Sequence, residues 1–373
     1  MSTTQVPYFV FRDYPAGINQ QVEEALLGAL RAQQYILGEA VEQFEGEFAK
    51  YVQAGMTIGV GNGYDALVVA LKAAGIGAGD EVIVPANTFI ATVNAVVWVG
   101  AIPVLAEPDR HTCNLTAAVA ATHITPRTKA IIPVHLYGQA CEMTGFLELA
   151  EQHHLVLIED FAQAQGASYK GRPVGSFGRV SATSFYPTKN LGALGDGGAV
   201  VTSDPELAAY ARMYRNYGQQ QKYHNQIIGV NSRLDTLQAA VLRTKLHHLD
   251  ALNSERQRLA QVYLTALQGI GDLVLPVTAP GCTHVYHIFN ICTRQRDALQ
   301  LYLSAQGIQT AIHYPVPVHL QEAYTWLGYS KGSFPVAEEL AATSLSLPLF
   351  PGMTEAEQEA VITSIHTFFE RHD

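Results

Sequence analysis

The sequence is poor in cysteine, and its four cysteines lie far apart without any CxxC pair. This spacing excludes a disulfide scaffold and argues against a zinc module. It fits the reducing cytoplasm, where we expect the protein to be located. The four residues are Cys113, Cys141, Cys282 and Cys292.

Charged residues are also scarce, at 15% of the 373 residues. The 23 Lys and Arg form no basic run, and 33 Asp and Glu give a net charge of −10, so we expect no nucleic-acid partner. Every apolar run is broken well short of the ~20 residues that a membrane span needs, so we expect no membrane segment. The opening MSTTQVPYFVFRD has no basic segment before an apolar one, so no signal peptide is predicted. The 14 histidines show no HxH or HExxH spacing, and we predict no metal site.

Hydrophobic residues, by contrast, make up 48% of the chain, enough for more than one domain of about 100–200 residues. Seven short runs are rich in β-branched residues and apolar on both faces, which is typical of strands buried in a mostly parallel sheet. The runs are 57–60, 81–85, 102–105, 129–134, 155–160, 181–186 and 199–203. Helical patterns at 65–74, 88–99 and 143–153 alternate with them, so we predict an α/β fold with helices on both faces of the sheet.

After Asp204 the pattern changes to two helices, the second a long one, and a smaller α+β pattern begins near residue 271. The expected elements are helices at 205–217, 233–258, 296–306 and 355–370 and a strand at 285–292. We therefore predict a large α/β domain at 1–250 and a small C-terminal α+β domain at 251–373.

A first motif, TIGVGNGYDAL, runs from a strand through Gly61 and Gly63 into a helix. Glycines allow a tight turn, and the free N–H groups at a helix start can hold a phosphate. With Ala66 the motif also fits the G-x-G-x-x-A pattern of dinucleotide sites. A nicotinamide site requires an acidic residue at the end of the second strand. The second predicted strand ends in EVIVPANTF, which has no carboxylate after its first residue. A tight turn without any ligand is the remaining interpretation.

A second motif, LVLIEDFAQAQGASY, brings Glu159 and Asp160 to the carboxyl end of an apolar strand. A buried carboxylate must be paired, hydrogen-bonded or functional, because burying it alone is costly. Asp160 can hold the protonated ring nitrogen of a cofactor. The alternative is a solvated aspartate that caps the next turn.

A third motif, SATSFYPTKNLGALGDGGAV, places Lys189 after a strand and before a loop of small residues. Small residues let a planar ligand approach the backbone, and a lysine with a lowered pKa there can form a Schiff base. Ser184 and Thr188 offer hydroxyls to a phosphate. A solvated surface lysine is the alternative for Lys189 taken alone.

Together the three motifs supply a phosphate-binding turn, an acid for a ring nitrogen and a lysine. Pyridoxal phosphate needs these three partners, whereas an NAD enzyme has no use for the last two together. The sequence therefore predicts a pyridoxal-phosphate site.

These motifs resemble those of the DegT/DnrJ/EryC1/StrS sugar aminotransferases, a group of fold-type-I pyridoxal-phosphate enzymes. The resemblance covers nearly the whole chain and includes GDEVIVPANTFIATVNAV, IEDFAQAQGASYKG, SFYPTKNLGALGDGGAV, NSRLDTLQAAVL and YPVPVHLQEAY. It implies a large domain with a mostly parallel seven-stranded sheet and a smaller C-terminal domain.

The resemblance also implies roles for single residues. Lys189 matches the lysine that binds the cofactor covalently and later moves the proton, and Asp160 matches the partner of the pyridine nitrogen. Gln163 matches a residue beside the ring hydroxyl. Phe89 matches the aromatic residue stacked on the ring, although a phenylalanine there could equally be core.

The phosphate contacts implied by the resemblance are Ser184 and the backbone N–H groups that begin the helix at Gly63, Tyr64 and Asp65. Asn231 matches an asparagine that hydrogen-bonds to the cofactor phosphate in the neighbouring subunit. The resemblance therefore implies a homodimer with shared sites. Many relatives carry a hydroxyl residue in place of Tyr64 and a small residue in place of Asp65, so here backbone groups should hold the phosphate.

The implied activity is amino transfer from glutamate to a nucleotide-linked sugar, with dTDP as the expected nucleotide. The GNGxDAL spelling resembles the branch that acts on 3-keto-6-deoxyhexoses. A 4-keto sugar aminotransferase, a sugar dehydratase, a non-catalytic cofactor-binding regulator and an NAD dehydrogenase are the alternatives. Lys189 favours transfer over the dehydratases, some of which have histidine there. The candidate substrate residues are Tyr186, Arg215, Tyr217, His313, Tyr314 and His319.

Overall fold

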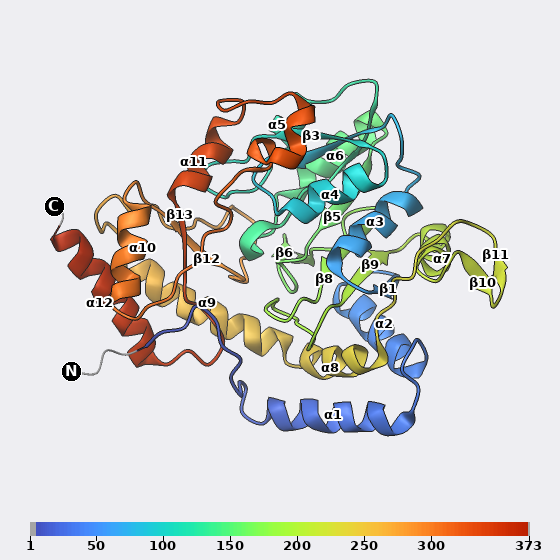
Figure 1. Ribbon diagram of the computed structural model, residues 1–373, viewed down its shortest axis with the longest axis horizontal. Coiled ribbons are helices and arrows are strands. Elements are labelled where there is room, and N and C mark those ends of the chain that lie inside the picture. Colours follow the sequence, from blue (N-terminus) through green and yellow to red (C-terminus); the bar gives the residue numbers. More distant parts are fainter. Residues whose placement is uncertain (1–4, 372–373) are drawn as a thin grey trace.

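A seven-stranded sheet lies at the centre of the computed structural model, which describes residues 5–371 (Figure 1). Its strand order is β1-β9-β8-β5-β4-β2-β3. The strands are β1 (Met56–Val60), β2 (Glu81–Pro85), β3 (Ile102–Ala106), β4 (Thr128–Ile131), β5 (Val156–Asp160), β8 (Val180–Ser184) and β9 (Gly198–Thr202). Each of the seven apolar runs forms one strand, and the predicted α/β fold is confirmed.

The sheet is parallel except at β9, which pairs antiparallel with both β1 and β8. The pairs from β8 through β5, β4 and β2 to β3 are all parallel. The carboxyl ends of these strands therefore lie along one edge of the sheet, which is where ligands bind in open α/β folds. This edge carries Asp160 at the end of β5 and Ser184 at the end of β8.

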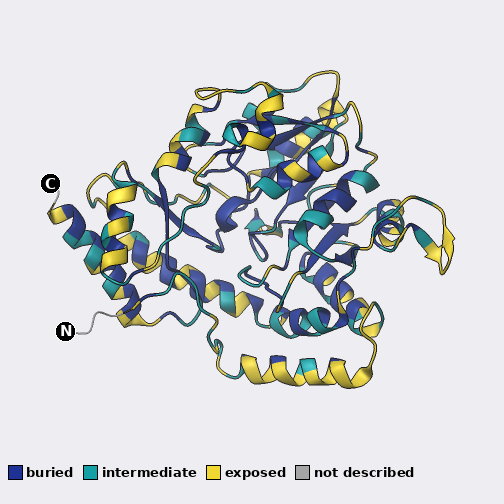
Figure 2. Ribbon diagram, in the orientation of Figure 1, coloured by how far each residue is buried: buried dark blue, intermediate teal, exposed yellow. Residues whose placement is uncertain are grey.

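Helices cover the sheet and bury their apolar sides against it, as the dark blue ribbons of Figure 2 show. The helices that connect strands of the sheet are α3 (Gly63–Ala73), α4 (Ile90–Trp98), α5 (Ala117–Ala121) and α6 (Met143–His153), and α7 (Pro205–Tyr214) follows β9, the last strand of the sheet in the chain. Side-chain caps define several starts: Asp204 accepts from the N–H groups of Glu206 and Leu207, and Pro205 follows at the first helical position. The helix predicted at 205–217 ends at Tyr214.

Two helices precede the sheet and had no counterpart in the predictions, α1 (Ile18–Ala32) and α2 (Glu39–Tyr51). Both pack against α8 (Thr236–Leu246). The single long helix predicted at 233–258 is wrong, because the chain breaks after α8 and continues as α9 (Leu249–Ala266). The break lets α8 pack beside α1 and α2 while the later part of α9 enters the C-terminal core (Figure 1).

The C-terminal part has its own hydrophobic core, built around β12 (Phe289–Cys292) and its antiparallel partner β13 (Ser344–Leu347). The surrounding helices are α10 (Arg296–Ala305) and α12 (Glu355–Glu370). α11 (Pro335–Thr343) contacts β12, but its buried Ala337 and Leu340 belong to a core of the large sheet. Val6 belongs to the same core, so the N-terminal segment packs with C-terminal elements. The division into domains at residue 250 stays a prediction.

The remaining elements are short. They are the strands β6 (Ser168–Tyr169), β7 (Arg172–Pro173), β10 (Gln219–Gln221) and β11 (His224–Asn225), and the 3₁₀ turns η1 (Leu136–Gly138), η2 (Val318–Leu320) and η3 (Glu322–Leu327). The β10–β11 hairpin projects from the body of the protein (Figure 1). Within residues 5–371, no helix is long and apolar enough to cross a membrane.

Candidate active site

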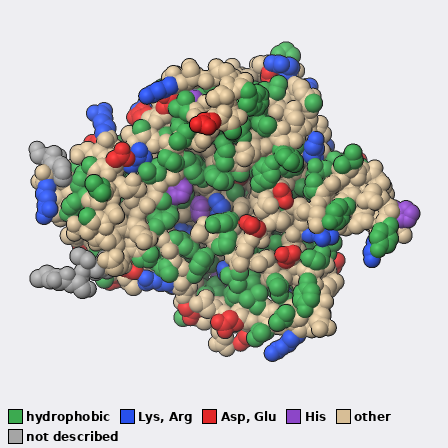
Figure 3. All heavy atoms as spheres, viewed as in Figure 1, with side chains coloured by type: hydrophobic (Ala, Val, Ile, Leu, Met, Phe, Trp, Pro, Cys, Tyr) green, Lys and Arg blue, Asp and Glu red, His purple; other side chains and the backbone are tan. Residues whose placement is uncertain are grey.

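A cavity of about 380 Å³ opens at the carboxyl edge of the sheet. Figure 3 shows the hollow in the middle of this face, with histidine side chains next to a basic one. Most of the predicted site residues line the cavity. They are Gly63, Tyr64, Phe89, Asp160, Gln163, Ser184, Tyr186, Lys189, His313 and Tyr314. The fold thus brings together residues from β5, β8, the starts of α3 and α4, and the C-terminal part.

Lys189 lies in the turn that follows β8, where its N–H donates to the carbonyl of Tyr186 (2.8 Å). Burial lowers the pKa of Lys189 to about 8, although the negative charge of Asp160 opposes the shift. Its Nζ lies 3.4 Å from Nε2 of His287. Burial also holds the pKa of His287 well below its ordinary value, so this imidazole is neutral and accepts a hydrogen bond from the lysine. An amine in this setting is a usable nucleophile near neutral pH.

Asp160 ends β5 with its carboxylate facing the cavity. Oδ2 accepts from the hydroxyl of Thr92 (2.8 Å), and Oδ1 accepts from the N–H of Ala162 (3.2 Å). Burial raises the pKa of Asp160, and the hydrogen bond from Thr92 is the largest opposing effect. Because Asp160 forms no ion pair among residues 5–371, its charge remains available to a cationic ring nitrogen.

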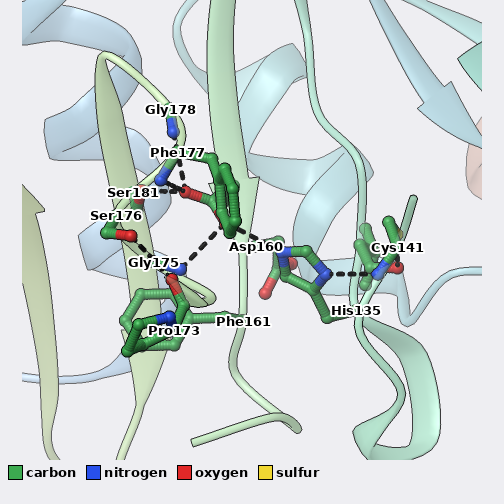
Figure 4. A network of polar contacts seen from close by, with 12 residues as sticks. His135, Cys141, Asp160, Phe161, Pro173, Gly175, Ser176, Phe177, Gly178 and Ser181 are labelled. Atoms are coloured by element: carbon green, nitrogen blue, oxygen red, sulfur yellow. Dashed lines mark hydrogen bonds and ion pairs between the residues drawn. The ribbon is translucent and has the colours of Figure 1, made fainter. Parts of the chain in front are cut away.

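The neighbouring Glu159 is fully buried, and its side chain points to the opposite face of β5 from that of Asp160, because successive strand residues alternate. Its hydrogen-bond donors come from His135 and from residues 175–181, which Figure 4 shows. It accepts hydrogen bonds from Gly175, Phe177 and Gly178 N–H groups, Ser181 Oγ and His135 Nε2. Nδ1 of His135 accepts from the N–H of Cys141 (2.9 Å), so Nε2 is the ring nitrogen that donates to Glu159. Burial raises the pKa of Glu159, but these hydrogen bonds, led by the one from His135, hold it below its ordinary value. Of the two acids predicted together, Glu159 anchors the strand end and Asp160 faces the cavity.

The start of α3 forms one end of the cavity. A Cβ at Gly63 would lie 2.4 Å from Cβ of Ser184, so only glycine fits beside that serine. N–H groups in the first turn of a helix have no intrahelical partner and attract anions, which leaves those of Gly63 and Tyr64 for a ligand. The N–H of Asp65 instead donates to the capping side chain of Asn62 (2.8 Å), and the Asp65 carboxylate accepts from Ser232 Oγ (2.6 Å).

Aromatic and amide side chains form the other wall. The Phe89 ring is 48% exposed, which leaves its face open to a ligand, and it lies 5.2 Å from the ring of Tyr314. Gln163 donates to the Tyr314 hydroxyl (3.1 Å) and accepts from the N–H of Tyr137 (2.7 Å). These bonds fix the amide of Gln163 and the ring of Tyr314 in the lining of the cavity.

Besides Asp65, four of the predicted residues do not line this cavity. Arg215 is buried and donates to Glu45 (2.5 Å) and to the carbonyl of Gly59 (2.6 Å). His319 is buried against Glu338 (2.9 Å). Tyr217 and Asn231 are exposed at the base of the projecting hairpin. In the single chain, none of the four reaches Lys189.

Two residues at the site were missed by sequence reasoning, Thr92 and His287. Thr92 follows the PANTF motif by one helical turn, so its spacing from Phe89 could have placed it on the same helix face. His287 lies in VYHIFNIC, which was interpreted only as a strand. The chain enters β12 at Phe289, two residues after the histidine.

Comparison with known proteins identifies one family over almost the whole chain. The profile of the DegT/DnrJ/EryC1/StrS aminotransferase family matches residues 17–366. Over 371 residues the chain is 47% identical to dTDP-3-amino-3,4,6-trideoxy-alpha-D-glucose transaminase of Streptomyces venezuelae, which covers 100% of this chain and 98% of that protein.

Solved structures agree at the level of the fold. The crystal structure of S. venezuelae DesV in complex with a ketimine intermediate has a TM-score of 0.97 and 47% identity, and covers 100% of both chains. That of NtdA from Bacillus subtilis, with the bound cofactor PMP, has a TM-score of 0.91 and 30% identity, and covers 99% of this chain and 86% of that one.

Proposed function

The chain belongs to the DegT/DnrJ/EryC1/StrS aminotransferase family, and from this premise we propose that it transfers an amino group from glutamate to a nucleotide-linked 3-keto-6-deoxyhexose with the help of pyridoxal phosphate. One observation carries the proposal. Lys189, with its lowered pKa, and Asp160, a buried carboxylate without an ion-pair partner in the described chain, line one cavity.

The cavity fits the cofactor at each of its functional groups. The N–H groups of Gly63 and Tyr64 and the hydroxyl of Ser184 would hold the phosphate. Phe89 would cover the ring, and Asp160 would face the ring nitrogen. When bound, pyridoxal phosphate supplies a ring that withdraws electrons from the carbon carrying the amino group.

The residues of the chain supply the rest of the chemistry. Lys189 would hold the cofactor through its Nζ, and once its amine is free it would move a proton from the α-carbon of the donor. His287, as a neutral acceptor 3.4 Å from Nζ, orients the lysine. Asp160 would keep a proton on the ring nitrogen through its negative charge, and Thr92 fixes the direction of that carboxylate.

The acceptor is proposed from similarity. A relative 47% identical is named for a dTDP-linked 3-amino sugar, and the GNGxDAL motif points to the same branch. Tyr186, His313 and Tyr314 line the cavity and are the candidates for sugar contacts, whereas Arg215 and His319 are bonded elsewhere in the fold. A 4-keto sugar is the second candidate acceptor. Location in the cytoplasm remains a prediction from cysteine spacing.

The absorbance spectrum of the holoenzyme tests this function. Addition of L-glutamate should replace the visible band of the lysine-bound cofactor with the near-ultraviolet band of its amino form. Addition of a dTDP-linked 3-keto sugar should then restore the visible band. A spectrum that no amino acid changes would contradict amino transfer.

We also propose a homodimer in which Asn231 completes the phosphate site of the partner. Support comes from the projecting hairpin and the loop after it, where Tyr223 is 81% and Ile228 is 95% exposed. Apolar side chains exposed to this degree favour burial against another surface. Asn231 is itself exposed and offers a neutral donor, which adds a hydrogen bond without further charge.

Mixing two inactive chains is expected to restore activity if the sites are shared. A Lys189→Ala chain keeps Asn231, and an Asn231→Asp chain keeps Lys189, so one of the two sites in a heterodimer has both residues. Random exchange of equal amounts should restore about one quarter of the wild-type activity by two-fold symmetry. If each site were complete within one chain, mixing would restore no activity. A protein that is fully active and monomeric by light scattering would also contradict the proposal.

A further inference from the structure

A second cavity, of about 130 Å³, shares Lys189 with the first. It is enclosed by the N-terminal segment, α1, α8 and α9, and several of its walls are apolar, including Phe9, Val22 and Leu252. Its lining contains four basic residues and, among the described residues, no Asp or Glu. The basic residues are Arg12, Lys189, Lys245 and Arg256. In a chain of net charge −10, such a local excess of positive charge is unexpected unless an anion binds there.

Arg256 is the most unusual of the four. Its side chain is only 3% exposed, and its Nε has no hydrogen-bond partner in residues 5–371. Nη1 donates to two carbonyl oxygens, of Leu349 (3.1 Å) and Tyr286 (3.3 Å), and no described carboxylate pairs with it. Burial lowers the pKa of Arg256 to about 10. Burying a cation without a counter-ion is costly, and an anion bound beside Arg256 would offset that cost.

Lys245 also lacks an anionic partner among the described residues. Its Nζ donates to the carbonyl of Gly192 (2.8 Å) and forms no ion pair with a described residue. Burial lowers the pKa of Lys245 to about 8. Arg12 differs, since it pairs with Glu357 (2.5 Å). Two cations of this cavity, Arg256 and Lys245, are therefore free to bind an anion.

The reactive lysine lies close to these cations. Lys189 lines both cavities, and the positive charges of Lys189 and Arg256 both lower the pKa of His287. A ligand that reacts at Lys189 can therefore reach toward Arg256. The small, partly apolar space suits a short aliphatic chain that ends in a carboxylate better than it suits a diphosphate with its nucleoside.

We propose that Arg256 and Lys245 bind the side-chain carboxylate of a dicarboxylic amino donor whose amino group reacts beside Lys189. This inference rests on the proposed function and adds the basis of donor selection. The guanidinium of Arg256 and the ammonium of Lys245 are both cationic donors, so their hydrogen bonds to the carboxylate are charge-assisted. A donor without the second carboxylate leaves both cations unpaired.

The test uses the holoenzyme and the Arg256→Met and Lys245→Met variants. Arg258→Met is the matched control, because Arg258 lies on the same helix, does not line this cavity, and has an exposed side chain that pairs with the buried Glu255. The L-glutamate concentration that half-converts the cofactor spectrum is measured, together with competition by glutarate, a dicarboxylate that has no amino group. We expect the half-conversion concentration of L-glutamate and the inhibition constant of glutarate each to rise about 10-fold to 100-fold in the two variants. Both values should stay unchanged in the control. L-Alanine should react equally poorly with all four proteins.

The alternatives give different results. The inference is overturned if the Lys245→Met protein binds glutamate and glutarate as tightly as wild type does. The same result in a folded Arg256→Met protein also overturns it. A change confined to the reverse reaction with a dTDP-amino sugar would also overturn it, because the cations would then bind the diphosphate. If no amino acid converts the wild-type holoenzyme, the proposed function itself fails, and glutarate binding by calorimetry still decides whether the cations hold a dicarboxylate.

Discussion

Replacing Lys189 with alanine is expected to abolish amino transfer while the protein stays folded. General acid–base catalysis by one positioned group contributes about 10²–10⁴-fold, and Lys189 supplies the covalent attachment as well, so the loss should exceed that range. Steady-state transfer rates, with circular dichroism as the check on folding, measure the effect. Lys170→Ala is the matched control, since Lys170 lies at the surface.

Borohydride reduction of the wild-type holoenzyme identifies the lysine directly. Reduction fixes the cofactor to the lysine that holds it, and peptide mass spectrometry then locates the adduct. We expect it on the peptide that contains Lys189. Recovery of the adduct on Lys129 or Lys170 would show that the assignment is wrong.

The Asp160→Asn change is expected to lower the rate by about 10²–10⁴-fold while the cofactor remains bound. Asparagine keeps the size of the side chain and an oxygen that can accept from Thr92, but it has no negative charge to hold the ring proton. Rates near those of wild type, with the cofactor spectrum intact, would contradict the role.

Glu159→Gln is the matched control for that change, because the two acids are neighbours on β5. Glu159 faces five donors in the buried network, so the amide cannot accept all of these hydrogen bonds. We expect a loss of about 1–3 kcal/mol in the free energy of unfolding, measured by denaturant titration. The two substitutions therefore separate chemistry at Asp160 from anchoring at Glu159.

The sheet and the centre of the site were predictable because both depend on local patterns. Strands buried on two faces give apolar runs, and the polar residues that end them, such as Asp160, meet at one edge of a parallel sheet. Lys189 and Gly63 follow strands of that same sheet. Sequence order alone therefore indicated that they would come together.

Features that depend on distant pairing were not predictable. Arg215 looked like a ligand residue, but its partner Glu45 is 170 positions away and no local pattern connects them. The break between α8 and α9 falls at His247 and His248 without a glycine or proline, and it is fixed by the two different cores that the helices enter. His287 reached the site only because the chain folds back from the C-terminal part toward Lys189.

The central claim is that this cavity moves an amino group to carbon 3 of a nucleotide-linked sugar. The direct measurement incubates the holoenzyme with ¹⁵N-labelled L-glutamate and a dTDP-linked 3-keto-6-deoxyhexose, and locates the label by NMR. The account predicts ¹⁵N bonded to carbon 3 of the sugar, with no transfer by the Lys189→Ala protein. Label on carbon 4 of a 4-keto substrate but never on carbon 3, or a sugar that gains no ¹⁵N at all, would contradict it.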